Sequence, residues 1–307
     1  MTIQQMEYIV AVNKYRHFVT ASEKCGVTQP TLSTMIQRLE DELGIKIFDR
    51  NKHPVEPTPM GLRIIKQAEQ TLVEIKKIKE IVQSETQGMS GNLKIGIIPT
   101  LAPYILPDFI DIFTKKYPQI ELSVSELRTQ TLIEEVTRGN IDMVIAATPL
   151  NNDNLLEIPL FYERFYAYFS DKNSDHAYSL SADNMPQEDL WVLQEGHCIR
   201  NQTFNFCKNF SLYNKKYEAG NIDNLIRIVD KNGGYSVIPE LHIPFLNEKQ
   251  KNNVVEIANP PAVREVSLVV QKDFIKERML NAVADTIKEI IPDNMLDERL
   301  KKFSIRL

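Results

Sequence analysis

One unbroken stretch, residues 59–87, constrains the fold of this 307-residue chain more than any other. Pro59 suits the first turn of a helix, and no helix breaker follows between Leu62 and about Gln87. A helix of that length spans about 39 Å at 1.5 Å per residue. Residues 88–92, which contain two glycines and a serine, then end the helix as a flexible joint.

The apolar residues of this stretch recur with the three-and-four spacing of a helix that packs against another helix. They are Leu62, Ile65, Ala68, Leu72, Ile75, Ile78 and Val82. A long helix with a narrow apolar seam is unstable alone, so we expect it either to form a homodimer or to pack against its own domain. The helix divides the chain into predicted domains at residues 1–58, 59–90 and 91–307.

The first domain reads as three short helices followed by two short strands. The second helix runs from Phe18 to Cys25 and is broken at Gly26, and the third begins after Thr28 and ends at Gly44. Helix, glycine turn and helix form the helix-turn-helix pattern, whose second helix enters the major groove of DNA. The strands, residues 45–50 and 55–58, would form a wing. A small helical bundle with a solvated polar face fits the same spacing equally well.

The net charge of the chain is only weak evidence against binding to nucleic acid. The whole chain carries −5, but residues 1–87 carry 12 Lys and Arg against 11 Asp and Glu, or +1. Binding to DNA would therefore depend on a local basic face.

Strands and helices alternate after residue 91. Residues 93–98, 120–124 and 141–146 read as buried strands separated by helices, which predicts a parallel α/β sheet. Ligands of such sheets lie beyond the carboxyl ends of the strands, where Thr100 and Thr129 fall. Further strands are predicted at 161–169, 191–193, 235–239 and 266–270, with a helix from about 276 to 291.

Residues 195–207 contain two of the three cysteines, Cys198 and Cys207. A thiolate beside cationic or hydrogen-bonding groups such as His197 and Arg200 is reactive, and a second thiol can convert an oxidised sulfur into a disulfide. Two inert buried cysteines are the alternative. Zinc needs about four ligands and only one histidine is near, so no metal or cofactor is expected. For the third cysteine, Cys25, we expect a structural role in packing and no redox role.

The spacing of the two cysteines has a geometric consequence. If residues 201–207 are helical, nine residues span about 13 Å, and about 30 Å if extended. A disulfide requires Cα atoms within about 7 Å. Oxidation to a Cys198–Cys207 disulfide would therefore remodel this segment.

Residues 21–50 resemble the winged helix-turn-helix of LysR-type transcriptional regulators. The resemblance rests on Ala21-Ser22, Val27-Thr28-Gln29-Pro30-Thr31-Leu32-Ser33, Ile36, Leu39-Glu40, Leu43-Gly44, Phe48 and Arg50. It implies DNA contacts from Gln29, Pro30, Thr31, Ser33, Arg38 and Arg50. It also implies that the helix at 59–87 pairs two subunits.

The family resemblance further implies the fold class. We expect an α/β protein with an N-terminal winged helix-turn-helix, a long linker helix and a two-lobed regulatory domain like the periplasmic binding proteins. Lobe I would comprise residues 91–162 and 265–307, and lobe II residues 163–264.

Two segments resemble the branch of this family that senses hydrogen peroxide. They are residues 96–107 and 195–207, with Gly196-His197-Cys198, Arg200, Gln202 and Phe206-Cys207 as the specific core. The resemblance implies Cys198 as the peroxide-reactive thiol and Cys207 as the resolving thiol. It further implies a peroxide site formed by Thr100, Thr129, His197, Arg200 and Arg264.

One residue departs from the pattern of this branch. Asn201 stands where the branch commonly has an acid that helps to deliver a proton to the leaving hydroxide. An amide is not such an acid, so the departure bears on the rate of the reaction.

The resemblance implies a peroxide-sensing regulator of the oxidative-stress response, an activator with repression left open, switched by a reversible disulfide. Promoter DNA, hydrogen peroxide and RNA polymerase are its expected partners, and homodimers would assemble into a homotetramer. We expect a cytoplasmic location, since neither a signal peptide nor a membrane helix is evident. No enzymatic activity is expected.

Two rival hypotheses remain. One is a LysR-type regulator that responds to an organic co-inducer and has inert cysteines. The other is a thiol peroxidase, a function that would leave the N-terminal winged helix unexplained.

Overall fold

The structure is a computed structural model that describes residues 1–86, 89–170, 180–181, 185–186, 189–206, 218–258 and 261–303. The chain divides into two compact units, Met1–Gly88 and Met89–Leu307. Each unit has its own hydrophobic core.

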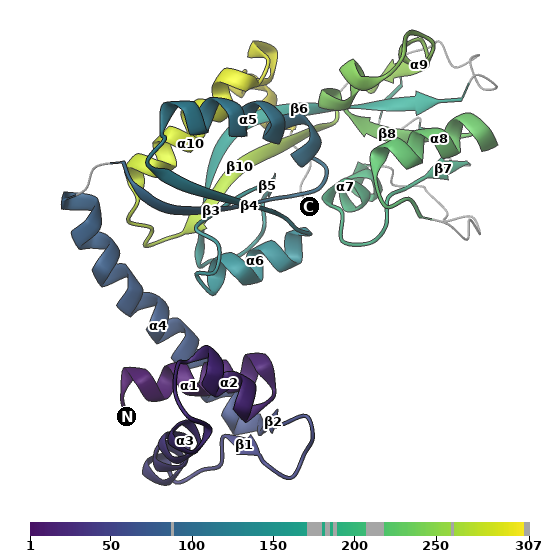
Figure 1. The fold of residues 1–307 in the computed structure, drawn as a ribbon. Helices are drawn as coiled ribbons and strands as arrows, with labels where there is room; N and C mark the ends of the chain where they lie inside the picture. The colour runs from purple at the N-terminus through teal and green to yellow at the C-terminus, as the bar shows by residue number, and fades with distance from the viewer. Residues whose placement is uncertain are drawn as a thin grey trace. The chain divides into compact units, whose positions relative to one another are not determined.

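The N-terminal unit contains the three predicted helices, α1 (Ile3–Tyr15), α2 (Phe18–Lys24) and α3 (Gln29–Leu43) (Figure 1). Two short strands, β1 (Phe48–Asp49) and β2 (Glu56–Pro57), pair antiparallel as the base of a wing. Helix α4 (Pro59–Thr86) follows. The apolar faces of α1 and α3 form the core because residues three and four apart share one side of a helix.

Helix α4 begins in close contact with the start of the wing. A Cβ placed on Gly61 would lie 2.0 Å from the carbonyl oxygen of Ile47. Only glycine allows the two backbones to approach this closely. The Thr58 side chain joins the same two segments, since its hydroxyl donates to the carbonyl of Lys46 at 2.7 Å and accepts from the Gly61 N–H at 2.9 Å.

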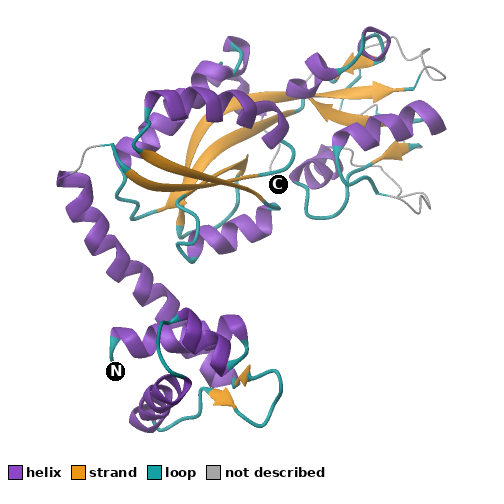
Figure 2. Ribbon diagram, viewed as in Figure 1, coloured by secondary structure: helices purple, strands orange, loops and turns teal. Residues whose placement is uncertain are grey.

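The second unit is built on a mixed sheet in the order β4-β3-β5-β10-β6-β8-β7, with β9 paired to β6. Figure 2 shows the strands against the helices that cover them. The strands are β3 (Gly91–Ile97), β4 (Ile120–Glu126), β5 (Met143–Thr148), β6 (Leu155–Phe169), β7 (Leu190–Trp191), β8 (Tyr235–Pro239), β9 (Val254–Glu256) and β10 (Val263–Gln271). The α/β fold class is confirmed, and the three strands from which a parallel sheet was predicted, β3, β4 and β5, do pair in parallel. Strand β3 is parallel to β4 and β5, whereas β10 runs antiparallel to β5 and β6 because it returns from the far end of the unit.

Helices cover both faces of this sheet. Helices α5 (Ala102–Lys116) and α10 (Glu277–Ile290) lie side by side on one face, and α6 (Thr129–Thr137) covers the other (Figure 1). The remaining helices are α7 (Cys198–Phe206), α8 (Ile222–Asn232), α9 (Glu248–Lys251) and the 3₁₀ segments η2 (Glu240–Phe245), η3 (Asp293–Met295) and η4 (Glu298–Phe303).

The longest strand, β6, changes its partner midway along the unit. Strand β6 pairs with β10 as far as Arg164 and with β8 from Phe165 onward. Glu163 on β6 lies directly opposite Arg264 on β10. The predicted lobe boundaries near 163 and 265 stay predictions. The register nevertheless brings two charged residues together at this crossing.

Candidate functional site

The polar face of α3 is exposed, as the helix-turn-helix pattern requires. Four of the predicted DNA contacts on this helix, Gln29, Pro30, Thr31 and Arg38, are exposed, and Ser33 is partly so. On the opposite side Leu32, Ile36 and Leu39 are completely buried. Thr28 is the N-cap residue, but its hydroxyl bonds the hydroxyl of Thr31 at 2.8 Å and caps no backbone N–H.

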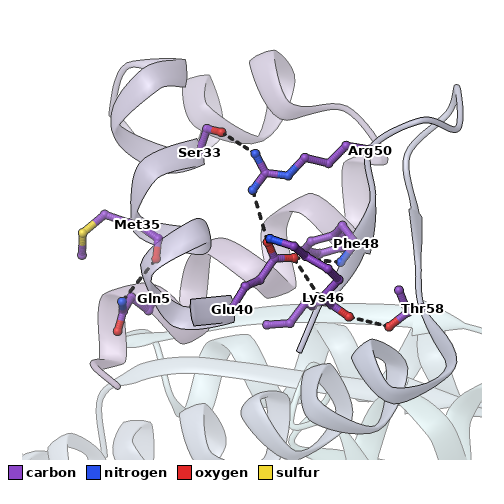
Figure 3. Close-up of polar contacts among 9 residues, drawn as sticks. Gln5, Ser33, Met35, Glu40, Lys46, Phe48, Arg50 and Thr58 are labelled. Atoms are coloured by element: carbon purple, nitrogen blue, oxygen red, sulfur yellow. Dashed lines mark hydrogen bonds and ion pairs between the residues drawn. The ribbon is translucent and has the colours of Figure 1, made fainter. Parts of the chain in front are cut away.

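Arg50, which follows β1, reaches back to the same helix. Its Nη1 donates to Ser33 Oγ at 3.1 Å (Figure 3). Its guanidinium lies 5.3 Å from the centre of the Phe18 ring. Two predicted DNA contacts from different elements are therefore adjacent. Their role in binding DNA stays a prediction.

Cys198 is the first residue of α7, and only 5% of it is exposed. Its sulfur lies 3.6 Å from Thr100 Oγ1 and 3.8 Å from Arg264 Nη1. A helix N-terminus, a hydroxyl and a guanidinium all favour negative charge on a sulfur. Three segments far apart in sequence thus converge on this thiol.

Arg264 is fully buried, and its N–H donors are directed to Thr100, Glu163 and the Cys198 sulfur. Nη1 and Nη2 donate to the hydroxyl and the carbonyl oxygen of Thr100, both at 3.1 Å. Nε and Nη2 bind Glu163 Oε2 at 2.7 and 2.6 Å. Burial alone would lower the pKa of Arg264, but the Glu163 carboxylate and the Cys198 sulfur outweigh it and raise that pKa. The guanidinium is therefore a permanent cation beside the sulfur.

Several buried polar atoms of α7, of the residue before it and of the first residue of α6 have no hydrogen-bond partner among the described residues. They are His197 Nδ1, Thr129 Oγ1 and both amide atoms of Gln202. Gln202 lies four residues after Cys198 and hence on the same side of α7. Buried polar atoms are normally paired, so these offer donors and acceptors to a small polar molecule.

The N-terminus of α6 lies against the segment that leads to Cys198. Arg128 Nη2 donates to Gln194 Oε1 at 3.2 Å, and a Cβ on Gly196 would lie 2.9 Å from Arg128 Cδ. Gly196 has a φ of +93°, so both its conformation and its surroundings favour glycine. Burial, with the nearby Arg128 cation, lowers the pKa of His197 below 6.5, although its bond to the Gly220 backbone opposes this. His197 is therefore a neutral imidazole at neutral pH and can both donate and accept.

Two other predicted residues of this site are Arg200, which forms ion pairs, and Cys207, which lies outside the described residues. Arg200 pairs with Glu218 at 2.8 Å and Glu195 at 3.9 Å. Its predicted action at the sulfur stays a prediction. Cys207 and the side chain of Asn201 lie outside the described residues.

Cys25 differs from Cys198 in its surroundings. It is half-buried against the core of the first unit. Burial, assisted by the charge of Glu7, raises the pKa of its thiol. These features favour the predicted packing role over reaction with an oxidant.

Sequence reasoning assigned no role to two residues that the geometry brings to this site. Glu163 was hidden inside an apolar strand, where a lone carboxylate among aromatic residues is itself the signal of a buried partner. Gln202 was part of the cysteine motif, and its spacing from Cys198 could have placed it.

Within the described residues, no group of three or more His, Cys, Asp or Glu side chains is arranged to hold a metal ion. None of the helices formed by those residues has the length and apolar character that a membrane span requires.

A helix-turn-helix unit, a long helix and an α/β regulatory unit together define the class of LysR-type transcription regulators. Residues 3–62 match the family described as "Bacterial regulatory helix-turn-helix protein, lysR family", and residues 86–291 match "LysR substrate binding domain". The chain belongs to the LysR family. It is therefore a DNA-binding transcription regulator and not an enzyme.

The similar proteins point to one branch of the family. The chain is 33% identical over 299 residues to "Hydrogen peroxide-inducible genes activator" of Haemophilus influenzae, covering 95% of this chain and 99% of that protein. It is 31% identical to "DNA-binding transcriptional dual regulator OxyR" of Escherichia coli K12, covering 98% and 99%. A full-length OxyR variant of Pseudomonas aeruginosa has a similar structure, with a TM-score of 0.75 at 31% identity over 94% of this chain and 98% of that one. The predicted membership of the OxyR branch is confirmed.

Proposed function

We propose that this regulator senses hydrogen peroxide through Cys198 and responds by altering its contact with promoter DNA. The observation that carries the proposal is the placement of the buried sulfur beside Thr100 Oγ1 and Arg264 Nη1. Relatives named as peroxide-inducible activators support it.

The first chemical step joins sulfur and oxygen. The Cys198 thiolate attacks one peroxide oxygen, the S–O bond forms, the O–O bond breaks, and hydroxide leaves and takes up a proton. Arg264 and Thr100 hold the sulfur, while His197, Thr129 and Gln202 supply the donors and acceptors that orient the peroxide. The product is a sulfenic acid.

The second step uses the resolving thiol. The Cys207 sulfur attacks the sulfenic sulfur, an S–S bond forms, and water leaves. Peroxide is thereby reduced to two waters while two thiols become a disulfide. Two cysteines this far apart along a regular helix cannot form a disulfide unless the chain between them changes its conformation. Oxidation therefore changes the fold of α7.

The effect of oxidation on DNA binding requires an assembly of subunits. We propose that α4 pairs two subunits and that dimers form a tetramer. Exposed apolar residues on α4, such as Leu62 at 49% and Ile78 at 64%, support pairing of this helix. Gln29, Pro30, Thr31, Ser33, Arg38 and Arg50 would contact the promoter. RNA polymerase as the activated partner, repression by the reduced form and a cytoplasmic location belong to the same proposal.

Mass spectrometry of alkylated protein before and after micromolar peroxide tests the chemistry. The expected result is loss of alkylation at Cys198 and Cys207, with Cys25 still alkylated. Cys207→Ser should stop at the sulfenic acid, and Cys25→Ser is the matched control that should behave as the wild type. A peroxide-dependent DNA footprint that survives Cys198→Ser would exclude this proposal.

The rival is an organic co-inducer bound between the lobes. The amide of Gln202 and the hydroxyl of Thr129, which have no hydrogen-bond partner among the described residues, could serve such a ligand as well. A thermal shift with a candidate metabolite, and none with peroxide, would favour the rival.

A further inference from the structure

Glu40 is a carboxylate buried inside the DNA-binding unit. Only 1% of the residue is exposed, and its side chain is completely covered. A buried carboxylate is costly unless it is paired, so the identity of its partners shows what it does. They all come from the segment that follows α3 (Figure 3).

The two oxygens of Glu40 have different partners. Oε1 accepts the backbone N–H groups of Ile47 at 2.8 Å and Phe48 at 3.2 Å. Oε2 lies 3.4 Å from Lys46 Nζ and 3.5 Å from Arg50 Nη2. One oxygen therefore holds the backbone of the wing, and the other lies between two cations.

Arg50 is oriented from three sides. Glu40 lies at one side of the guanidinium, Ser33 Oγ accepts from Nη1 at 3.1 Å, and the Phe18 ring faces it at 5.3 Å. Its side chain is still 37% exposed. The contact with Glu40 is longer than the 2.7–2.9 Å typical of a charge-assisted hydrogen bond, so donors remain for another anion.

Lys46 extends the same charged surface. Its backbone carbonyl is fixed by the Thr58 hydroxyl, while its side chain is 64% exposed. Lys46 and Arg50 contact the same Glu40 oxygen and repel each other, and a negative charge beside them offsets that repulsion. Glu40 supplies that charge from the buried side and leaves the exposed side positive.

We propose that Lys46 and Arg50 together bind a backbone phosphate of DNA beside α3, and that Glu40 is the positioning residue for this pair. The carboxylate touches no DNA and acts by holding both cations next to Ser33. Since residues 1–87 carry a net charge of only +1, placement of a few cations matters more than bulk charge.

The alternative is that Glu40 only anchors the wing through Ile47 and Phe48. Glu40→Gln separates the two because the amide oxygen can still accept both backbone N–H groups. If Glu40 is merely an anchor, removal of a negative charge near DNA leaves binding unchanged or strengthens it. If it positions the cations, the same change weakens binding.

The experiment measures equilibrium binding of the full chain to a random-sequence DNA duplex over a range of salt concentrations. For Glu40→Gln we expect binding to weaken about fivefold, and the slope of log affinity against log salt to fall by about 0.9 for each phosphate that the variant no longer neutralises. Glu42→Gln is the matched control: it makes the same charge change at an exposed position of α3, with 52% of its side chain accessible, and should bind no more weakly than the wild type.

Two further variants test whether Glu40 acts through the cations. Lys46→Ala changes an exposed side chain, so it should fold normally and by itself weaken binding and reduce the slope. In a Lys46→Ala/Arg50→Ala background, Glu40→Gln should have no further effect. Unchanged binding by Lys46→Ala, an undiminished slope for Glu40→Gln, or a full effect of Glu40→Gln in the double background would each overturn the proposal.

Discussion

Arg264 and Glu163 lie opposite each other on β10 and β6, and their fully buried side chains form an ion pair of 2.6 Å next to the Cys198 sulfur. The guanidinium serves Glu163, Thr100 and the sulfur at once. If the sulfur moves away after oxidation, Arg264 keeps Glu163 as its counter-charge. Glu163 is thus a counter-charge for Arg264 that does not depend on the position of the sulfur.

Removing one partner of this pair should destabilise the regulatory unit strongly. Arg264→Met leaves Glu163 buried and unpaired, which costs about 3–5 kcal/mol. Urea unfolding measures the loss. The double variant Glu163→Leu/Arg264→Met should recover much of that stability and still react slowly with peroxide. Native reactivity in the double variant would show that the pair is only a scaffold.

The Thr100 hydroxyl should contribute to the reactivity of Cys198. Thr100→Val keeps the shape and removes the donor at 3.6 Å from the sulfur. Loss of a hydrogen bond worth about 1 kcal/mol corresponds to about a fivefold slower reaction. Stopped-flow oxidation of Cys198 measures it. Thr286→Val, at an equally buried threonine whose hydroxyl bonds only its own helix, should leave the rate unchanged.

Much of the fold was predictable from local patterns. Glycine marks the ends of two helices, since Gly26 and Gly44 both have φ of +68°. Strand β8 has its predicted bounds, residues 235–239. The antiparallel return of β10 was not predictable, since strand direction depends on contacts between distant segments.

The candidate site was predictable only in part. The motif around Cys198 and the position of Thr100 after β3 named two candidate residues, and the family resemblance added Thr129, His197 and Arg264. The register that brings Glu163 opposite Arg264 joins positions 101 residues apart. A carboxylate among the apolar residues of β6 signals a buried partner but does not reveal which residue that partner is. The contact of Glu40 with Lys46 and Arg50 was missed for another reason. Its helix position marks it as buried, but the spacing does not reveal which cations cover it.

Stability of the regulatory unit should fall in mild acid, partly through His242. This residue is 3% exposed, and Nδ1 bonds the Tyr104 hydroxyl at 2.8 Å. Burial lowers its pKa below the 6.5 of an unfolded chain, opposed in part by Asp223. The unfolded state therefore binds the proton first. The contribution is complete above pH 6.5 and is lost as pH falls through the folded pKa.

Thermal unfolding from about pH 7.5 to about pH 5.5 measures this effect. His242→Gln can keep a hydrogen bond to Tyr104 but does not titrate, so its stability should fall less over that range. Burial raises the pKa of Glu163, so protonation of Glu163 in acid opposes the loss of stability. This effect is the same in the wild type and in His242→Gln. Identical pH profiles would assign the acid sensitivity to other groups such as His197.

Gly61 should be required for the join between the wing and α4. Gly61→Ala places a methyl group against the Ile47 carbonyl, and overpacking of this kind costs about 1–3 kcal/mol. We expect weaker DNA binding and a lower unfolding free energy, with an unchanged rate of Cys198 alkylation. Gln67→Ala, at an exposed position of the same helix, is the control. Full stability of Gly61→Ala would mean that the two backbones can separate without cost.

Helix α7 should unfold when the proposed disulfide forms. Cys198 is its first residue, and Cys207 follows its last residue, Phe206. Eight helical steps from 198 to 206 advance the chain by about 12 Å. A disulfide needs Cα atoms within about 7 Å. Ile199, Gln202 and Thr203 are at most 2% exposed, so unwinding also breaks buried packing.

Hydrogen exchange with and without peroxide tests this expectation. Amides of residues 198–206 should exchange faster after oxidation, while those of β3 keep their protection because that strand is paired on both sides. Cys207→Ser should show no increase, since a sulfenic acid at Cys198 imposes no distance constraint. If Cys207→Ser gains exchange equal to that of the wild type, oxidation of Cys198 alone disrupts the helix, and the disulfide is not the conformational signal.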